Sequence, residues 1–509
     1  MMKKLVKILA FILTAVVAMS FATGCKKSVP ETEYDVELAL WEAGNGRLFL
    51  DKTIEAFKVK HPEINIHVKA SAEVQTGDLT SGVSINSVDL YMTTMEGWVG
   101  YTEYLEPLDD VLNATVDGVK LKTKFDQNIL NYANTSPTDG KVYVLPWATS
   151  INGLVYNNDL FVEHGYKVPR TTNELKTIVT AATDKKNTDN KNPNAFIHYS
   201  SYWYYLVSAW QAQYDGVEAY LDSWMLKHKG QENSLATFTD KTGGRYKAYE
   251  TLYELLAPRG VLYNGSNGLD HTGAQTIFLN GRALMMPNGS WVENEMKSLN
   301  TGADIRMMKT PVISSIAPKL GINENILSVF VADIDGEADT LTAQEQQLLA
   351  TAKANYQDAY NAVAAIRNVA FTEGAQHHAF IPNYASAKEA AKTFLEFYYS
   401  DEAIKIFYNT TNMPSAAKLA TGTPDTTGWS NFGKATLNMY ENANLIFKYL
   451  AHPVFYKAGE QQIYKYDMAR LFSATDEKDR KDINAMWDYE SKYWTDNWNL
   501  LLELAGIVA

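Results

Sequence analysis

The chain has 509 residues, of which 46% are hydrophobic, so it is long enough for two or three ordinary domains with their own cores. Its net charge of -13 argues against binding to a nucleic-acid backbone, which requires clustered Lys and Arg. A single cysteine excludes intramolecular disulfides and cysteine-rich zinc sites. The 31 tyrosines and 11 tryptophans suit binding pockets and interfaces, and they equally suit a large core.

The first residues have the pattern of a signal peptide. Lys3, Lys4 and Lys7 precede an apolar run over 8–19, and small residues follow at 22–24. The run is shorter than the roughly 20 apolar residues that span a membrane, and it ends at a small-residue cleavage signal. Residues 1–24 are therefore predicted to be a signal peptide that is removed.

The residues at the expected cleavage point are Ala22, Thr23, Gly24 and Cys25, and they resemble the lipobox of bacterial lipoproteins. In that motif the cysteine is acylated and becomes the first residue of the mature chain. The resemblance implies a lipid such as palmitate on Cys25 and a place on the outer face of the bacterial cytoplasmic membrane. Residues 25–35 are then a polar tether. The alternative is an ordinary secretory cleavage site with a free or buried cysteine.

The folded part is predicted to begin with a β-α-β unit. Apolar residues alternate over 36–40 as in a strand, follow helical spacing over 50–57, and alternate again over 64–68. Pro62 ends the intervening helix. Two parallel strands joined by a right-handed crossover are therefore expected.

Further strands are predicted over 88–92 and 142–146, and strands that alternate with helices imply an α/β architecture. Helices are expected to begin near residues 172, 343 and 387, where a hydroxyl residue precedes a glutamate by three positions as in a capping box. These pairs are Thr171 with Glu174, Thr342 with Glu345, and Ser386 with Glu389. The helix over 343–366 has one apolar stripe and looks like an insertion.

Five segments in the same order resemble one known family. A helix ends at Pro62 before a strand, and the later segments are GKVYVLPW at 140–147 with GLVYNNDLF at 153–161, PRTTNEL at 169–175, NGRALMMPNGSW at 280–291 and SAKEAAKTFLEFYYS at 386–400. Together they resemble the extracellular solute-binding proteins of bacterial sugar ABC importers, the family that includes the maltose-binding proteins. The resemblance covers nearly the whole mature chain.

This resemblance implies a two-lobed, periplasmic-binding-protein-like α/β fold in which each lobe is a mixed sheet flanked by helices. The chain is expected to cross between lobes near 148–153, 310–312 and 411–414. The first lobe is then 36–149 and 312–411, with a helical insertion at about 335–370, and the second lobe is 150–311 and 412–509. A cleft between hinged lobes can close on a ligand and bury it from water.

The family binds sugars with aromatic faces against the rings and with carboxylates, amides and hydroxyls on the sugar hydroxyls, since buried polar groups must be paired. The ligand residues that the resemblance implies are Trp41, Glu42, Asn45, Thr94, Glu96, Trp147, Ser150, Asn152, Trp203, Tyr204, Asn288 and Trp291.

Each of these assignments has a structural alternative. Trp41 and Trp147 could cap the core at strand ends, and Glu42 and Glu96 could be solvated. At most half of the aromatic run over 202–205 can face a cleft. At the C-terminal end, the spacing of Trp487, Trp494 and Trp498 predicts helix packing in a core rather than sugar contact.

Motifs of catalysis are missing from the sequence. It has no Walker loop, nucleophile elbow or zinc-protease helix motif, and the adjacent His377 and His378 would face opposite sides and so make a poor metal site. The prediction is a monomeric protein that binds an oligosaccharide and delivers it to ABC permease subunits, with no enzymatic activity, cofactor or metal and no nucleic-acid partner. The alternatives are a lipid-anchored surface enzyme that degrades glycans and a lipoprotein that docks on a membrane sensor.

Overall fold

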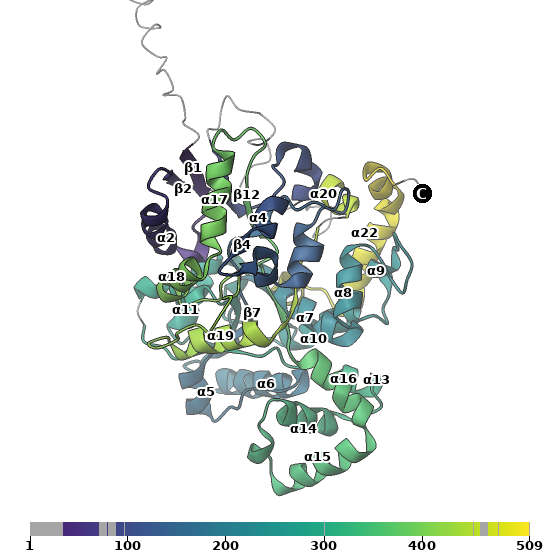
Figure 1. The fold of residues 1–509 in the computed structure, drawn as a ribbon. Coiled ribbons are helices and arrows are strands. Elements are labelled where there is room, and N and C mark those ends of the chain that lie inside the picture. The colour runs from purple at the N-terminus through teal and green to yellow at the C-terminus, as the bar shows by residue number, and fades with distance from the viewer. Residues whose placement is uncertain are drawn as a thin grey trace, which may run out of the picture.

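The computed structural model describes residues 34–70, 79, 88–95, 97–299, 301–450, 452–458, 467–476 and 478–507. The predicted signal peptide, Cys25, most of the tether and the predicted ligand residue Glu96 lie outside these ranges. The described part contains two large β-sheets with helices packed around each (Figure 1). The predicted α/β class is therefore confirmed.

The first sheet is mixed, with the strand order β2-β1-β3-β12-β6. Its strands are β1 (Asp35–Leu40), β2 (Asn65–Ala70), β3 (Leu90–Thr94), β6 (Leu145–Pro146) and β12 (His377–Phe380). β1 pairs in parallel with β2 and β3, while β12 is antiparallel to β3 and β6. Helix α2 (Leu48–Lys60) joins β1 to β2 and buries Phe49, Leu50 and Phe57. The predicted β-α-β unit is confirmed.

The second sheet has the strand order β13-β11-β7-β9-β8, with β10 beside β7. Its strands are β7 (Asn152–Asn157), β8 (Asn194–Phe196), β9 (Ala283–Gly289), β10 (Ile305–Met308), β11 (Val369–Phe371) and β13 (Asn444–Ile446). Both β7 and β9 are buried at every position, as expected for strands covered on both faces. A separate short hairpin consists of β4 (Thr115–Val116) and β5 (Val119–Lys120).

Helices cover both sheets. Those of the first lobe are α2, α4 (Asp109–Asn113), α17 (Lys388–Tyr398) and α18 (Asp401–Thr411). Those of the second lobe are α5 (Asn158–His164), α6 (Thr172–Thr188), α7 (Trp203–Asp215), α8 (Val217–Trp224), α9 (Ala236–Thr239), α10 (Gly244–Leu256), α11 (His271–Leu279), α12 (Val292–Glu295), α13 (Ile316–Lys319), α14 (Glu324–Ile334), α15 (Ala343–Asn355), α16 (Gln357–Arg367), α19 (Asn431–Asn442), α20 (Pro453–Ala458), α21 (Met468–Phe472) and α22 (Ile483–Leu504). In Figure 1, α14 to α16 form the end of the molecule farthest from β1 and β2.

The helical insertion belongs to the second lobe, which corrects the predicted lobe boundaries. The strand that follows it, β11, pairs with β7 and β13 in the second sheet. Arg367, at the end of α16, is buried and donates to the Thr310 carbonyl at 2.7 Å, and its guanidinium lies 2.8 Å from the Asp335 carboxylate. This buried ion pair fastens the insertion to the end of β10. The chain therefore returns to the first lobe after β11 and not near 310–312.

The last crossing also comes later than the predicted 411–414. Met413 and Trp429 are buried in the core of the first lobe. The Lys418 backbone N–H donates to the Lys124 carbonyl of the same lobe at 2.7 Å. Residues 412–430 therefore still pack on the first lobe, and the chain enters the second lobe at α19, which packs against β10.

The helix predicted over 343–366 is in fact two helices, α15 and α16. They are separated at Tyr356, whose φ of -133° and ψ of 44° lie outside the helical region. The start of α15 has the predicted capping box, since the Thr342 hydroxyl accepts from the Glu345 N–H and the Glu345 carboxylate accepts from the Thr342 N–H at 2.8 Å.

The C-terminal helix α22 packs in the core through its tryptophans, as predicted. Trp487 and Trp494 are each 1% exposed, and the Trp494 ring stacks on Phe238 with a centroid distance of 3.7 Å and an interplanar angle of 4°. Within the described residues, none of the helices combines the length and the apolar character needed to span a bilayer.

We expect Trp494→Ala to lower the free energy of unfolding by about 3–5 kcal/mol, because it leaves a cavity opposite the Phe238 ring. Urea denaturation followed by circular dichroism measures this change. The control on the same helix is Tyr489→Ala, whose side chain is exposed, with an expected change within about 0.5 kcal/mol. Equal effects of the two substitutions would contradict the packing role of Trp494.

Candidate ligand-binding site

Two segments that cross between the lobes, 147–151 and 372–376, lie side by side. The hydroxyl oxygens of Thr149 and Thr372 are 3.0 Å apart. The Ser150 hydroxyl accepts a hydrogen bond from the Glu373 backbone N–H at 3.2 Å. The two crossings therefore form one hydrogen-bonded hinge, and the side chain of Glu373 begins at this hinge.

Glu373 accepts hydrogen bonds from two tyrosines of α7. The hydroxyls of Tyr204 and Tyr205 donate to its Oε1 at 2.6 and 2.8 Å. Burial raises the pKa of the Glu373 carboxyl, and the two tyrosine hydrogen bonds oppose that shift. A carboxylate can accept about four hydrogen bonds, so the tyrosines use only part of its capacity.

Trp291 lies where the two lobes touch. It follows β9, it packs against the cores of both lobes, and its ring is edge-on to Tyr202 and Tyr205 at centroid distances of 5.9 and 6.3 Å. Gly44, just after β1, allows this approach, because a Cβ there would lie 2.7 Å from the Trp291 Cβ. The Asn294 amide then donates to the Gly44 carbonyl at 2.7 Å, which joins the lobes directly.

The first lobe contributes a stacked pair of rings beside this contact. Trp41 directly follows β1, is half-buried and stacks on His377, with a centroid distance of 5.6 Å and an interplanar angle of 23°. His377 lies opposite Thr94 in the pairing of β12 with β3. Burial lowers the pKa of His377 to about 4, so its ring is neutral at physiological pH. The pair is therefore uncharged.

The structure brings most of the predicted ligand residues to this interlobe region. They are Trp41, Glu42, Asn45, Thr94, Ser150, Asn152, Tyr204, Asn288 and Trp291. Asn152 and Asn288 lie on the paired strands β7 and β9, at the end that faces the first lobe, and both are buried. Polar side chains from the second sheet and rings from both lobes thus meet at the hinge.

Trp147 and Trp203 lie elsewhere. Trp147 is buried, donates from Nε1 to the Thr93 carbonyl at 3.0 Å and stacks on Phe49, so it caps the core of the first lobe. This is the alternative that the sequence left open. Trp203 is also buried and donates to Nδ1 of His198 at 2.8 Å. It meets Phe196 edge-on at a centroid distance of 5.1 Å, so it lies in the core of the second lobe rather than in the cleft to which it was assigned.

Four residues of the interlobe region were missed by the sequence reasoning, namely Tyr202, Tyr205, Glu373 and His377. Periodicity cannot tell which side of the 202–205 run faces the hinge, because that depends on how α7 docks on the sheet. Glu373 did carry a signal, since it follows an apolar strand and precedes a glycine. An acidic residue at the end of a buried strand is a common place for a binding group.

A small cavity lies beside the hinge. This cavity of about 20 Å³ lies between Val99 of the first lobe and Lys448 of the second, which is room for about one water molecule. Among the described residues, no group of His, Cys, Asp and Glu is arranged to hold a metal ion.

A sequence profile of bacterial extracellular solute-binding proteins matches residues 43–405, which is more than two thirds of the chain. The chain belongs to this family. The match covers both lobes and includes the first two crossings, Gly44, Trp291 and Glu373. The predicted family is therefore confirmed, and it is a family of binding proteins rather than of enzymes.

Two relatives in this family carry names that refer to sugars. The diacetylchitobiose binding protein NgcE of Streptomyces coelicolor is 26% identical over 292 residues, which cover 54% of this chain and 56% of that protein. The multiple sugar-binding protein of Streptococcus mutans is 29% identical over 188 residues, which cover 36% of this chain and 41% of that protein. The chain thus spans about half the length of the relatives that it matches.

Solved structures share the fold. A chitin oligosaccharide binding protein has a TM-score of 0.59 at 17% identity, covering 92% of this chain and 100% of that chain. The structure of RafE from Streptococcus pneumoniae has a TM-score of 0.58 at 15% identity, covering 92% of this chain and 99% of that chain. The predicted two-lobed fold is confirmed by these similarities.

The raised pKa of Glu373 predicts a dependence of stability on pH. Between the ordinary pKa and the raised pKa, the folded state holds the proton that the unfolded state has lost, so the free energy of unfolding falls as pH rises through this interval. Glu373→Gln removes this contribution. The stability of the wild type relative to the variant should therefore fall as the pH rises above 4.5, the ordinary pKa of a glutamate carboxyl.

Urea denaturation of both proteins at several pH values measures this difference. Glu163→Gln is the control, because it removes one carboxylate from an exposed position on α5. A difference between wild type and Glu373→Gln that does not change with pH would contradict the effect of burial on this carboxyl.

Proposed function

We propose that this chain binds an oligosaccharide between its two lobes and delivers it to an ABC importer. The observation that carries the proposal is the interlobe cluster, where the rings of Trp291, Tyr202 and Trp41 surround a polar hinge in a chain of the solute-binding family. Aromatic faces suit the apolar faces of sugar rings. The relatives named for diacetylchitobiose and for multiple sugars support a carbohydrate as the ligand.

The polar groups at the hinge suit sugar hydroxyls. Glu373 supplies a strong acceptor, and beside it the Ser150 hydroxyl donates to Asn152 Oδ1 at 2.6 Å. These groups are partly or fully buried, so a ligand that lacks matching hydroxyls would leave them unpaired at a cost of about 1–3 kcal/mol each. The aromatic rings would then supply affinity, and the hinge groups would supply selectivity for polyhydroxylated ligands.

Ligand access requires the lobes to separate. In the structure the Trp291 side chain lies against Gly44 and the Asn294 amide bonds across the lobes, so these contacts would have to break for a ligand to enter between the lobes at this point. Rotation about the crossing segments would open a space there, and a ligand that contacts both lobes would favour closure. Closure would be the signal that the permease recognises.

Lipid on Cys25 would hold the binding protein near its permease on the outer face of the bacterial membrane. A tether of about ten residues extends at most about 3.3–3.6 Å per residue, which keeps the lobes close to the bilayer and raises their local concentration at the transporter. The binding protein would act as a monomer, because one cleft and one permease contact suffice for delivery.

A glycan-degrading enzyme is the less favoured alternative. Such an enzyme needs two carboxyl groups about 5–9.5 Å apart on either side of the scissile bond. At the hinge the Glu373 carboxyl is held by two tyrosines, and the family consists of binding proteins.

We expect the purified protein to show a saturable change in tryptophan fluorescence with oligosaccharides such as diacetylchitobiose, chitin oligosaccharides and raffinose. Loss of a sugar platform commonly costs several kcal/mol, so Trp291→Ala should weaken the binding by at least about 100-fold. Isothermal calorimetry on both proteins measures the affinity. No response across a broad glycan panel would contradict the proposal, and so would an unchanged affinity in the variant.

The control is Tyr489→Ala, which removes an exposed ring on α22 and should leave sugar affinity unchanged. Thermal melting of both variants separates loss of binding from loss of folding. Product analysis after long incubation with the bound sugar distinguishes the alternatives, because cleavage would favour the enzyme.

We expect Cys25→Ala to release the protein from the membrane fraction into the medium while sugar affinity stays the same. The physical reason is that the lipid anchors the chain but lies outside the folded lobes. Cell fractionation with immunoblotting and calorimetry on the released protein measure the two effects. Retention in the membrane fraction would contradict a lipid anchor at this residue.

A further inference from the structure

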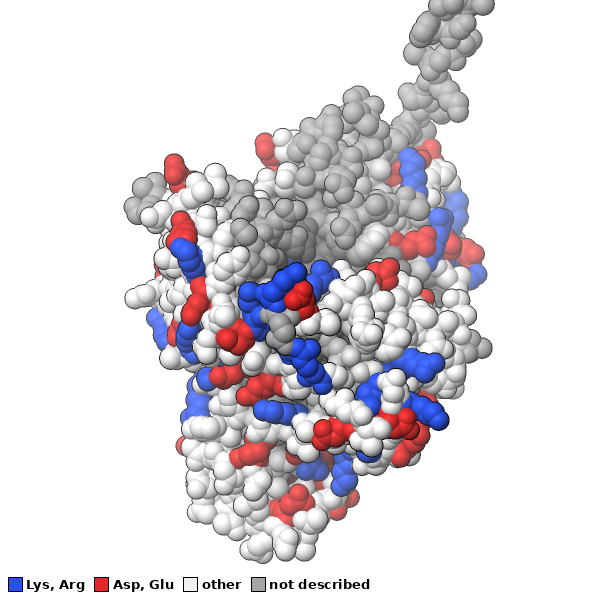
Figure 2. All heavy atoms as spheres, turned by 180° about the vertical axis from the view of Figure 1, so that it is seen from behind, with Lys and Arg blue, Asp and Glu red and all other residues white. Residues whose placement is uncertain are grey.

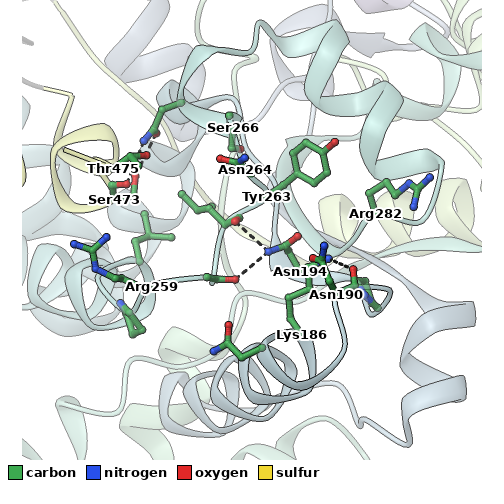
Figure 3. Close-up of a pocket in the computed structure, with 18 of the residues that line it drawn as sticks. Lys186, Asn190, Asn194, Arg259, Tyr263, Asn264, Ser266, Arg282, Ser473 and Thr475 are labelled. Atoms are coloured by element: carbon green, nitrogen blue, oxygen red, sulfur yellow. Dashed lines mark hydrogen bonds between the residues drawn. The ribbon is translucent and has the colours of Figure 1, made fainter. Parts of the chain in front are cut away.

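A large pocket lies on the second lobe, away from the hinge. It has a volume of about 800 Å³ and is formed by the C-terminal end of α6, the loops around β8, the loop that follows α10, the turn before β9 and the segment after α21 (Figure 3). Figure 3 shows Arg259 and Arg282 on opposite sides of this pocket, with Tyr263 and Asn264 between them. We call it the outer pocket.

The outer pocket is separate from the interlobe region. β9 begins next to Arg282, which lines the pocket, and ends at Gly289, next to Trp291. Six residue steps at about 3.3 Å each place these two ends about 20 Å apart. A ligand in the outer pocket would therefore not touch the hinge residues.

The charge of the pocket lining is opposite to that of the whole chain. The chain has 59 acidic and 46 basic residues, and Figure 2 shows both signs interspersed on one face of the molecule. The described residues that line the pocket include no Asp or Glu. Its five cationic residues are Lys186, Lys191, Arg259, Arg282 and Arg480. A positive field confined to one concave surface favours an anionic ligand.

Three of the cations, Lys186, Arg282 and Arg480, have no carboxylate partner among the described residues. Lys186 donates to the backbone carbonyls of Asn190 and Asn192 at 2.6 and 2.8 Å, which position the ammonium without cancelling its charge. Arg282 and Arg480 form no ion pair with any carboxylate among the described residues. Their guanidinium groups are suited to bidentate pairing with a carboxylate.

The floor of the pocket is preorganised. Buried Asn194 donates to the carbonyls of Gly260 and Leu262 at 2.9 and 3.1 Å, which fixes the loop after α10. Because Trp203 donates to Nδ1 of His198, Nε2 carries the proton and donates to Asn267 Oδ1 at 2.9 Å. A rigid floor reduces the entropy that binding would otherwise cost.

The remaining polar groups suit hydroxyls. Six asparagines line the pocket, together with serine, threonine and tyrosine side chains. Amides and hydroxyls can both donate and accept, which matches the hydroxyl groups of a saccharide better than it matches a bare inorganic anion.

We propose that the outer pocket is a second binding site, which takes a saccharide that carries carboxylate groups. Arg282 and Arg480 pair with the carboxylates, and the asparagine amides bond the ring hydroxyls. The site is independent of the interlobe region and of the sugar proposed there.

Calorimetry with trigalacturonate tests the proposal, with its fully methyl-esterified form as the matched neutral ligand. At about 20 mM salt we expect binding of the acid and at least tenfold weaker binding of the ester. The affinity for the acid should fall at about 200 mM salt, because the Debye length is shorter at the higher salt concentration and the attraction between exposed charges is weaker. Equal binding of acid and ester, or no binding of the acid at low salt, would overturn the proposal.

The variant Arg282→Gln/Arg480→Gln should bind trigalacturonate at least tenfold more weakly than the wild type. The control Lys52→Gln/Lys492→Gln removes the same charge from exposed positions on α2 and α22 and should keep the affinity. Thermal melting checks that both variants fold. Equal affinity in the two double variants would overturn the assignment to this pocket.

Two further arms identify the site and the ligand. Trp291→Ala should leave trigalacturonate binding unchanged. Loss of binding in this variant would show that the acid binds in the interlobe region and would overturn the proposal. Inorganic phosphate at the same concentration should bind at least tenfold more weakly than trigalacturonate, and the reverse order would show a phosphate site instead.

Discussion

The hydrogen bonds between the two crossing segments, 147–151 and 372–376, fix the position of the two sheets relative to each other. The hydroxyls of Thr149 and Thr372 and the bond from the Glu373 N–H to Ser150 join segments that are more than 220 residues apart in the sequence. Since β7 starts at one segment and β11 ends at the other, the second sheet is anchored there at two adjacent strands. The position of the Glu373 carboxyl, and of the tyrosines that bind it, follows from this pairing.

The contact between Trp291 and Gly44 depends on that hinge. A bulky ring can reach the first lobe only where its backbone carries no Cβ, and the hinge brings Gly44 to this place. The lobes then share an apolar surface through Trp291, and direct hydrogen bonds from the Asn294 amide to the Gly44 carbonyl and from the Ser430 hydroxyl to the Glu293 carboxylate add to it. Such an interface can separate without leaving many unpaired polar groups, which is what a reversible closure requires.

The local sequence pattern predicted the helices and strands well. The features that it could not predict depend on packing between residues that are far apart in the sequence. Alternation and helical spacing sufficed for β1, α2 and β2, because each buries one continuous apolar stripe. The lobe of the insertion could not be predicted, since it depends on the pairing of Arg367 with Asp335 and on the register of β11. The same limit applied to the site, because the resemblance placed Trp291 beside the cleft while the docking of α7 turned Trp203 into the core.

The outer pocket and the interlobe region share β9, and this has a consequence for their coupling. The strand is buried at each of its seven positions and is paired with β7 on one side and with β8 on the other. A strand that is buried and paired on both sides moves together with its sheet, because a close-packed interior transmits strain to its neighbours. A ligand in the outer pocket would therefore move with the second lobe as one body. It could alter sugar affinity only if it bound the open and closed arrangements differently. The bonds of Asn194 and Asn267 in the pocket floor are made within the second lobe alone, so they do not change when the lobes separate. The two sites are thus expected to bind independently, so that the outer pocket can hold its ligand while the lobes open and close.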